Sequence, residues 1–250
     1  MPGSSIEYGT AVADAVELFE TGLGLGRELD AECLVLGESV PGGTTTALAV
    51  LLALGFAADG RVSGSTPGNA HALKTRVAHT ALAAAGLLPG DARRDPLRAV
   101  SCVGDPMQPL AVGIALGARC DVLLAGGSQM VAVAALLAAL EPVALERVAI
   151  GTTRWVIEDP AADVVGLVRE VSTDLPLLAA NLDFSRSRHA GLRAYEQFLV
   201  KEGVGAGGAS IAALLGTAQP LEHLHSAIDT VYDELLGRLT SSDSTDSCRR

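Results

Sequence analysis

The sequence predicts an α/β protein: a parallel β-sheet with helices on both faces, in a Rossmann-like three-layer arrangement, plus a small helical appendage made by the terminal helices. Three observations predict this class. Short β-branched runs alternate with longer runs rich in Ala and Leu, as in parallel sheets whose strands are buried on both faces. Hydrophobic residues make up 49% of the 250 residues, but aromatic residues only 3%. The 28 glycines favour closely packed helix-on-sheet layers over a β-sandwich.

The order of the runs predicts the individual elements. Strands are expected at residues 33–37, 121–127, 147–153 and 176–183, where β-branched and apolar residues dominate. Each strand is followed by a predicted helix, at residues 44–55, 128–140, 161–170 and 189–201. Further helices are expected at residues 8–29, 70–86, 106–118, 207–216 and 219–239. Residues 87–98 contain Pro and paired charges and are expected to form a surface loop.

These elements divide the chain into three parts. The α/β domain is expected to span residues 30–216. The helices of 1–29 and 217–240 do not alternate with strands, so they are expected to pack together as the appendage. The polar residues 241–250 are expected to be disordered.

Charge and composition exclude several classes of function. The net charge of −11 argues against nucleic acid or an anionic membrane surface as a partner. The sequence shows no signal peptide, and its two long uncharged windows are broken by Gly-Gly, so a soluble cytoplasmic protein is expected. The four cysteines and five histidines have no metal-ligand spacing, so neither a metal nor a cofactor is expected.

The four predicted strands end in similar polar turns. The turns are GESVPGGTTT, GGSQM, GTTRW and NLDFSRSRH. Together they supply glycine residues and hydroxyl groups, and a predicted helix follows each turn. Ligands of parallel sheets bind beyond the carboxyl ends of the strands, and helix N-termini favour anions. Arg154, Arg186, Arg188 and Lys74 could add positive charge there. Ordinary helix capping explains any one turn, but four on one edge predict an anionic, phosphorylated ligand.

The glycine motifs narrow the kind of ligand. The sequence has no GxxxxGK[ST] match, and its GxGxxG match, GVGAGG at 203–208, follows a helical pattern. A dinucleotide site requires a preceding strand, so an oxidoreductase is disfavoured. Glu38 and Glu202 each lead a glycine-rich turn. Each could act as a general base in a partly buried pocket. Alternatively, Glu38 is an ordinary carboxylate that pairs with a nearby Arg, and Glu202 is a solvated charge at a helix end.

Several ordered motifs together resemble one enzyme family. The motifs are GESVPGGTTTALAVLLALG, VGDPMQPLAVGIALGA, LLAGGSQM, IGTTRW and KEGVGAGG. They are similar to nicotinate-nucleotide–dimethylbenzimidazole phosphoribosyltransferase, and most similar to its divergent archaeal and cyanobacterial branch. The resemblance implies transfer of the phosphoribosyl group of nicotinate mononucleotide to 5,6-dimethylbenzimidazole or a related base. The products would be α-ribazole 5′-phosphate and nicotinate, in assembly of the lower ligand of cobalamin. It also implies a homodimer.

The resemblance implies roles for single residues. Glu202, which opens an EG-x-G-type turn, matches the family's base, while Glu38 matches a second active-site carboxylate and Lys74 a family lysine. One base is sufficient, because a pyridinium leaving group departs neutral and needs no general acid. The phosphate-binding residues implied are Gly42, Gly43, Thr44, Thr45, Gly126, Gly127, Ser185, Gly203 and Gly205, with Arg154 and Arg186 sharing the substrate's phosphate and carboxylate.

One departure from the family leaves alternatives open. Family members carry a leading segment that supplies part of the benzimidazole pocket, and this sequence starts without it. Either a separate polypeptide supplies that segment, or the gene model is truncated, or the protein binds nucleotide without transfer. The last alternative is a non-catalytic or incomplete nucleotide-binding homologue. A generic phosphosugar-binding enzyme is a third possibility.

Overall fold

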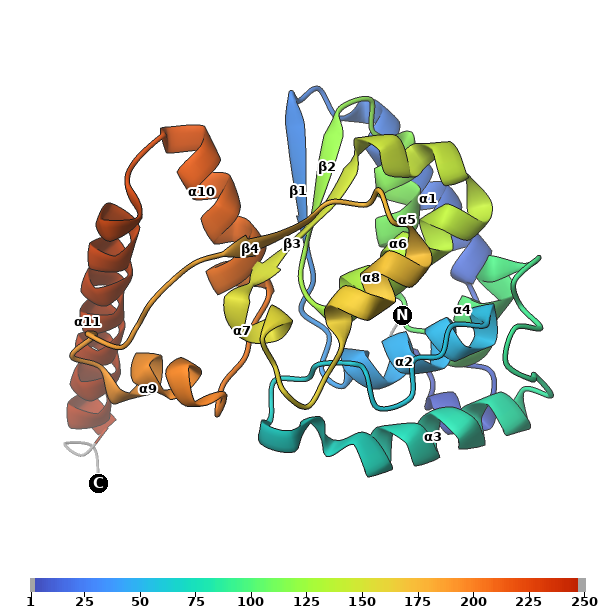
Figure 1. The fold of residues 1–250 in the computed structure, drawn as a ribbon, viewed down its shortest axis with the longest axis horizontal. Coiled ribbons are helices and arrows are strands. Elements are labelled where there is room, and N and C mark those ends of the chain that lie inside the picture. The colour runs from blue at the N-terminus through green and yellow to red at the C-terminus, as the bar shows by residue number, and fades with distance from the viewer. Residues whose placement is uncertain (1–2, 247–250) are drawn as a thin grey trace.

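A parallel sheet of four strands forms the centre of the structure, a computed structural model that describes residues 3–246 (Figure 1). The strands are β1 (Cys33–Gly37), β2 (Asp121–Ala125), β3 (Val148–Thr153) and β4 (Leu177–Ala180), and they lie in this order across the sheet. All three pairings are parallel, so all four strands end at the same edge. The predicted parallel α/β fold is confirmed.

Alternation along the strands gives the sheet two apolar faces. Val122 and Leu124 of β2 join the main core, whereas Leu123 between them joins a second, smaller cluster, as the two-residue period of a strand requires. The main core is built with α2 (Gly43–Leu54), α5 (Met107–Gly117), α6 (Ser128–Leu140) and α8 (Val164–Val171). Residues 128–137 of α6 are all buried, which explains why this helix has no polar face.

The second face is covered by a shorter segment near the C-terminal end of the fold. A π-helical turn, Val204–Ala209, and α10 (Ser210–Thr217) contact the strands. A Cβ on Gly208 would lie 2.3 Å from the Cβ of Ala125, and one on Gly207 would lie 2.7 Å from the carbonyl carbon of Thr152. The GVGAGG stretch therefore needs these two glycines so that its backbone can lie directly on β2 and β3.

Helix α1 (Ala15–Glu28) packs on α5, on the side of the body away from the C-terminal helices (Figure 1). A Cβ on Gly22 of α1 would lie 2.3 Å from the carbonyl oxygen of Leu110, and one on Gly113 of α5 would lie 2.2 Å from that of Phe19. The two helices thus touch backbone to backbone. This corrects the predicted packing of residues 1–29 with residues 217–240, because the glycine faces of α1 and α5 fit each other.

Two glycines on α1 provide a test of this packing. Gly22→Ala is expected to lower the free energy of unfolding by about 1–3 kcal/mol, because the added methyl group has no room. Gly24→Ala should raise it by about 0.5–1 kcal/mol, since a Cβ there meets nothing within 4 Å and Ala favours helix. Urea unfolding followed by circular dichroism measures both. Equal effects of the two changes would contradict the backbone contact.

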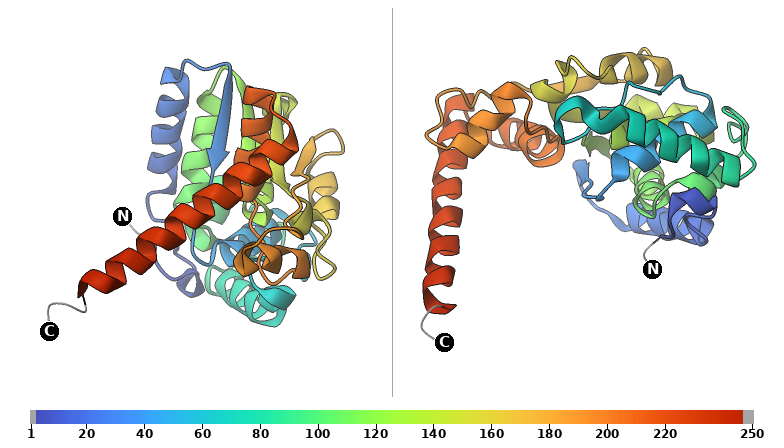
Figure 2. Two further views of the ribbon diagram at one scale, coloured as in Figure 1. Left: turned by 90° about the vertical axis from the view of Figure 1, so that its left-hand side faces the viewer. Right: turned by 90° about the horizontal axis from the view of Figure 1, so that it is seen from below.

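The remaining helices are α3 (His71–Ala84), α4 (Pro96–Val103), α7 (Arg154–Ile157), α9 (Ala190–Arg193) and α11 (Leu221–Asp246). They lie around the body, except that α9, α11 and the turns beside them form a C-terminal part, called the appendage from here on. Short 3₁₀ turns cover Ile6–Tyr8, Pro67–Ala70, Pro142–Arg147 and Ala194–Gln197. Helix α11 lies on the same side of the body as α9 and α10 (Figure 1), and the right-hand view of Figure 2 shows it extending away from the body.

Several predicted segments differ from the structure, among them the helix expected at 8–29, which begins at Ala15. The helix expected at 189–201 is reduced to α9 and a 3₁₀ turn, and the turn ends at Phe198, which adopts a left-handed conformation with φ of 54°. The loop expected at 87–98 gives way to α4 at Pro96, where the Asp95 side chain caps the helix by accepting from the backbone N–H of Arg98. The tail expected at 241–250 is helical through Asp246, and residues 247–250 lie outside the described part.

Two kinds of feature are absent from residues 3–246. No helix among them has both the length and the apolar character needed to cross a membrane. Within the same range, no group of three or more His, Cys, Asp or Glu side chains is placed to hold a metal ion.

Candidate functional site

A polar cleft of about 360 Å³ opens at the carboxyl ends of β1 and β2. Its walls include seven residues that the sequence predicted for the site: Glu38, Gly42, Gly43, Thr44, Gly127, Glu202 and Gly203. Seven polar or glycine residues that were not predicted join them: Ser39, Ser63, Gly64, Ser65, Ser128, Gln129 and Lys201. The strand ends thus bring together residues more than 160 positions apart in the chain, at the edge where parallel sheets bind ligands.

Two helices begin at this cleft. Helix α2 starts at Gly43 and α6 starts at Ser128, and both residues line the cleft. The first-turn N–H groups of a helix have no partner within the helix, and they carry a partial positive charge. Gly42 precedes α2 with φ of 76°, a left-handed conformation that glycine adopts without strain. The cleft therefore has the features of an anion site.

Gln129 fills the space that a side chain at position 43 would occupy. A Cβ on Gly43 would lie 1.5 Å from Oε1 of Gln129, so a side chain at position 43 would force the end of the Gln129 side chain to move. Gln129 in turn hydrogen-bonds Glu38, which also accepts from the backbone N–H of Val40 at 3.3 Å. The first glycine of helix α2 thus allows an amide to reach the carboxyl group at the end of β1.

Glu38 is a carboxyl group in a demanding environment. Burial raises its pKa above the ordinary value, and the nearby charges of Asp105 and Glu202 act in the same direction. The hydrogen bonds from Val40 and Gln129 oppose the shift without cancelling it. Because a raised pKa makes protonation easier near neutral pH, Glu38 is suited to exchange protons or to donate a hydrogen bond.

Glu202 is held by the turn that it precedes. Its Oε1 accepts from the backbone N–H groups of Val204 and of Gly205, the latter at 2.7 Å. Its Oε2 accepts from the backbone N–H of Ala206 at 2.8 Å. A carboxylate offers about four acceptor positions, so three are occupied and about one remains for a ligand. The turn therefore fixes the orientation of the carboxylate.

Both lysines of the chain lie at this site. Lys201 lines the cleft, and its Nζ contacts Asp159 at 2.7 Å. The Nζ of Lys74 lies behind the lining, 2.4 Å from where a Cβ on Gly64 would be. It is buried, and within residues 3–246 it finds no hydrogen-bond partner. Burial and the positive charge of Lys201 lower the pKa of Lys74 to about 8, against the opposing charge of Asp159.

The other predicted site residues lie elsewhere. Arg154 does not reach the cleft: it pairs with Glu196 and donates to the carbonyl of Leu182 at 2.7 Å. Ser185 and Arg186 are exposed on the loop before α9, and neither lines a cavity with the cleft residues. This loop is tied to the appendage instead, since Ser187 bonds Asp229 of α11 at 2.6 Å. Thr45 and Gly126 are neighbours of the lining.

A second, mostly apolar cavity of about 380 Å³ shares Glu202 with the cleft. Its other walls come from the appendage and the π-helical turn, and include Phe184, Leu192, Tyr195, Gly205, Ala206, Leu224 and Ile228. Phe184 and Tyr195 contact each other edge to face with ring centroids 5.5 Å apart. Aromatic and aliphatic walls with one carboxylate suit a flat apolar ligand that carries an N–H group.

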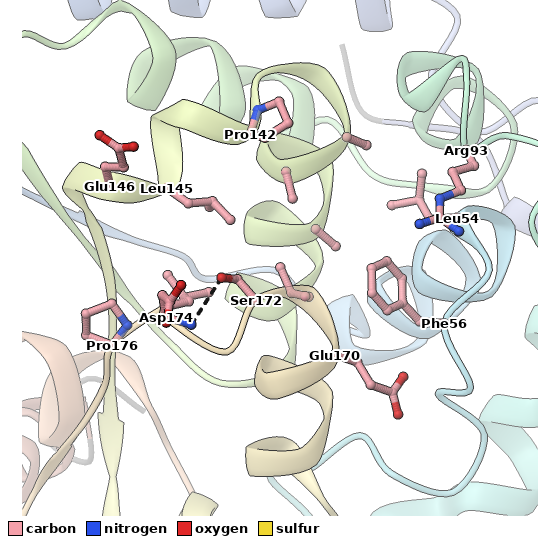
Figure 3. A pocket seen from close by; sticks show the side chains of 15 residues that line it. Leu54, Phe56, Arg93, Pro142, Leu145, Glu146, Glu170, Ser172, Asp174 and Pro176 are labelled. Carbon is pink, nitrogen blue, oxygen red and sulfur yellow. Dashed lines mark hydrogen bonds between the residues drawn. The ribbon is translucent and has the colours of Figure 1, made fainter.

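A further cavity, of about 630 Å³, shares no residue with the cleft, and Figure 3 shows the side chains that line it. Leu54 at the end of α2 and Val171 at the end of α8 line it, together with Phe56 and Arg93. It therefore lies at the C-terminal ends of these helices, opposite the sheet edge at which the helices begin. None of the predicted site residues lines it.

The sequence did not single out several residues that the structure places at the site. Lys201 was recognisable only as one of two lysines. Asp105 accepts a hydrogen bond from the Thr46 hydroxyl, and its pKa is raised by burial; it stands in the VGDPMQPL motif without a role being predicted for it. Gln129 lies in the GGSQM turn, where only the glycines were expected to act.

Comparison with solved structures defines the class of the fold. The chain shares its α/β fold with two structures from Thermus thermophilus. One is a nicotinate-nucleotide-dimethylbenzimidazole phosphoribosyltransferase, at a TM-score of 0.54 and 22% identity over 79% of this chain and 59% of that chain. The other is described as CobT, at a TM-score of 0.55 and 22% identity over 79% and 60%. The resemblance seen in the motifs is therefore confirmed at the level of the fold.

Curated relatives define the family. UPF0284 proteins match at 44% identity in Methanothermobacter thermautotrophicus (94% of this chain, 66% of the relative), 44% in Thermococcus onnurineus (94% and 69%) and 49% in Gloeobacter violaceus (93% and 63%). The chain belongs to the UPF0284 family, with relatives in archaea and cyanobacteria, and it spans about two thirds of their length. No family model matches the chain.

Proposed function

We propose that the chain binds nicotinate mononucleotide in the polar cleft and transfers its phosphoribosyl group to a benzimidazole-type base in the adjoining apolar cavity. One observation carries the proposal: Glu202 belongs to the walls of both cavities. A reaction that joins a phosphorylated sugar to a flat aromatic base needs a proton acceptor where the two ligands meet. The activity named for the Thermus structure with the same fold supports this choice of substrates.

The cleft supplies the groups that a mononucleotide needs. The starts of α2 and α6 would bind the phosphate through backbone N–H groups of their first turns, and Thr44 lines the same region. Lys74 would add a positive charge, since its Nζ has no hydrogen-bond partner among the described residues. With Arg154 and Arg186 turned away from the cleft, the phosphate is assigned to the helix starts and Lys74.

Transfer then requires one proton acceptor. As a nitrogen of the base attacks C1′ of the ribose, the bond to the pyridinium nitrogen of nicotinate breaks and nicotinate leaves neutral at that nitrogen. The base loses the proton of its N–H group, and Glu202 would accept it at the oxygen position that the turn leaves free. Positioning of the two reactants between the cavities would provide much of the rate increase. The products are α-ribazole 5′-phosphate and nicotinate, as in cobalamin lower-ligand assembly.

The test is an assay of the purified chain with nicotinate mononucleotide and 5,6-dimethylbenzimidazole, with chromatographic detection of ribazole phosphate. Product formation that depends on both substrates is expected. A full-length relative assayed in the same way is the positive control. If the chain alone binds the nucleotide tightly but forms no product, transfer is contradicted.

A second candidate, nucleotide binding without transfer, is favoured by a specific observation. Three of the acceptor positions of Glu202 are already used by backbone N–H groups, which limits its freedom to take up a proton. In this case calorimetry would detect nicotinate mononucleotide binding, and addition of dimethylbenzimidazole would leave the bound nucleotide intact.

Lys74→Met is expected to weaken nicotinate mononucleotide binding by about tenfold to a hundredfold, the value of a charge-assisted hydrogen bond. The affinity of the unaltered protein should fall as the pH rises through about 8, since the pKa of Lys74 is lowered to about 8 and the neutral amine loses its attraction for phosphate. Lys74→Met should remove this step. Calorimetric titrations between pH 6.5 and 9 measure both effects.

The same substitution should stabilise the free protein at pH 7. Because the pKa of Lys74 is below its ordinary value of 10.5 in the folded state, the unfolded chain binds more protons between about pH 8 and 10.5, and this group's contribution to stability rises over that range. Below it, a charged, buried and unpaired ammonium destabilises the fold. Arg76→Met, at an exposed position of α3, is the control. A lower melting temperature for Lys74→Met would contradict this assignment.

A further inference from the structure

Lys201 makes a buried ion pair directly beside the proposed base. Its side chain and that of Asp159 are each 2% exposed, with Nζ 2.7 Å from Oδ2. The same ammonium donates to Oδ1 of Asn69 at 2.9 Å. Glu202 follows Lys201 in the chain, so whatever fixes residue 201 also limits where the carboxylate of residue 202 can lie.

The three residues form the centre of a network that joins segments distant in sequence. Asp159 also accepts from the hydroxyl of Ser63 at 2.9 Å and from the amide of Asn69 at 2.8 Å. Asn69 accepts from the backbone N–H of Gly64 at 2.8 Å. Ser63 and Gly64 are walls of the cleft. The network therefore links Lys201, the residue directly before Glu202, to the wall of the cleft.

The backbone at Asn69 is held in an uncommon conformation. Asn69 has φ of 56° and the following Ala70 has φ of 48°, a left-handed region that alanine rarely occupies. Such residues persist where the surroundings fix them, and they concentrate at functional sites. Here the side chain of Asn69 is fully buried and bonded to Gly64, Asp159 and Lys201.

The other side of Glu202 is fixed by contact rather than by charge. A Cβ on Gly203 would lie 2.6 Å from the carbonyl carbon of Gly126 and 2.8 Å from the nitrogen of Gly127, so its backbone rests on the turn after β2. Glu202 is therefore held between an anchored lysine and an anchored glycine.

We propose that Asp159, Lys201 and Asn69 form a positioning network that holds Glu202 at the junction of the two cavities, an inference that rests on the transfer reaction proposed above. None of the three acts on the reacting atoms. Asp159 and Lys201 neutralise each other, and Asn69 links the pair to the cleft wall. Loss of the network should let the segment 201–203 shift, and a displacement of about 1 Å in a reacting group reduces turnover about a hundredfold.

The test uses the double substitution Asp159→Asn with Lys201→Met, because removing only one partner leaves an unpaired buried charge that endangers folding. The matched control is Asp233→Asn with Arg188→Met, which removes an ion pair between exposed residues of the appendage. Three quantities are measured for each protein: hydrogen exchange at the amides of Val204, Gly205 and Ala206, kcat for transfer, and Kd for nicotinate mononucleotide.

The amide measurement does not depend on activity. These three N–H groups bond to the Glu202 carboxylate, so their exchange should be about tenfold faster when Glu202 moves away. We expect this in the network variant and not in the control, together with a kcat lowered about a hundredfold and a smaller change in Kd. Unchanged exchange, or a Kd that weakens as much as kcat falls, would overturn the positioning role. Absence of turnover in the unaltered protein would instead refute the proposed function, and the exchange data would still decide whether the network holds Glu202.

Discussion

Glu202→Gln is expected to lower kcat for phosphoribosyl transfer by about 10²–10⁴-fold while nicotinate mononucleotide still binds. The amide has nearly the shape of the carboxylate but cannot accept the proton of the incoming base. The turn should survive the change. A glutamine whose carbonyl oxygen replaces Oε1 retains the bonds from Val204 and Gly205, and it loses only the bond from Ala206.

Glu38→Gln is the comparison that gives this experiment its meaning. Glu38 lies in the same cleft, and its pKa is raised chiefly by burial, so it is the alternative candidate for the general base. Single-turnover rates and nucleotide affinities should be measured for both variants. A larger loss of rate in Glu38→Gln than in Glu202→Gln would exchange the roles assigned to the two residues.

The sequence predicted the sheet well because its strands are local in character. The bounds predicted for the first strand, 33–37, match those of β1, and those predicted for one helix, 128–140, match α6. Continuous apolar runs between glycine-rich turns predict these elements without any tertiary information. The helix prediction for 189–201 was wrong for the opposite reason. Its composition favours helix, but tertiary contacts such as the pairing of Glu196 with Arg154 hold the segment in short turns.

The site was predictable where it follows from the ends of strands. Glu38, Gly42 and Gly127 lie at the cleft because parallel strands end at one edge. The prediction placed Arg154 and Arg186 at the cleft, whereas the structure does not. The position of a charged residue near a strand end does not reveal which group it pairs with. Arg154 finds Glu196, 42 residues further on. Lys201 was missed for the same reason, since its role depends on Asp159 and Asn69, and these contacts exist only in the folded chain.

The GVGAGG stretch shows how one motif can satisfy two different requirements. As a dinucleotide motif it fails, because it follows a broken helix and a loop rather than a strand. In the structure, Gly207 and Gly208 are needed for contact with the strands, whereas Gly203 is needed for contact with the turn after β2. The glycines therefore serve backbone packing, and the packing holds Glu202 at the cleft.

Gly203→Ala is consequently expected to damage both stability and function. Gly203 has φ of −106° and ψ of −11°, a conformation that alanine adopts readily, so the requirement for glycine is one of space alone. The new methyl group would lie 2.6 Å from the carbonyl carbon of Gly126 and 2.9 Å from its oxygen, and neither backbone atom can move without separating the two glycine-rich turns. The free energy of unfolding should fall by about 1–3 kcal/mol.

Gly205→Ala in the same turn is the matched control. A Cβ there meets only Oε2 of Glu202, at 3.5 Å, which is an ordinary contact, so stability should be unchanged or slightly increased. Denaturant unfolding and nicotinate mononucleotide titration should be carried out on both variants. If separation of the turns also displaces Glu202, Gly203→Ala loses transfer activity even below its unfolding temperature. Equal stability and activity of the two variants would show that the contact between residue 203 and the turn after β2 does not hold the site together.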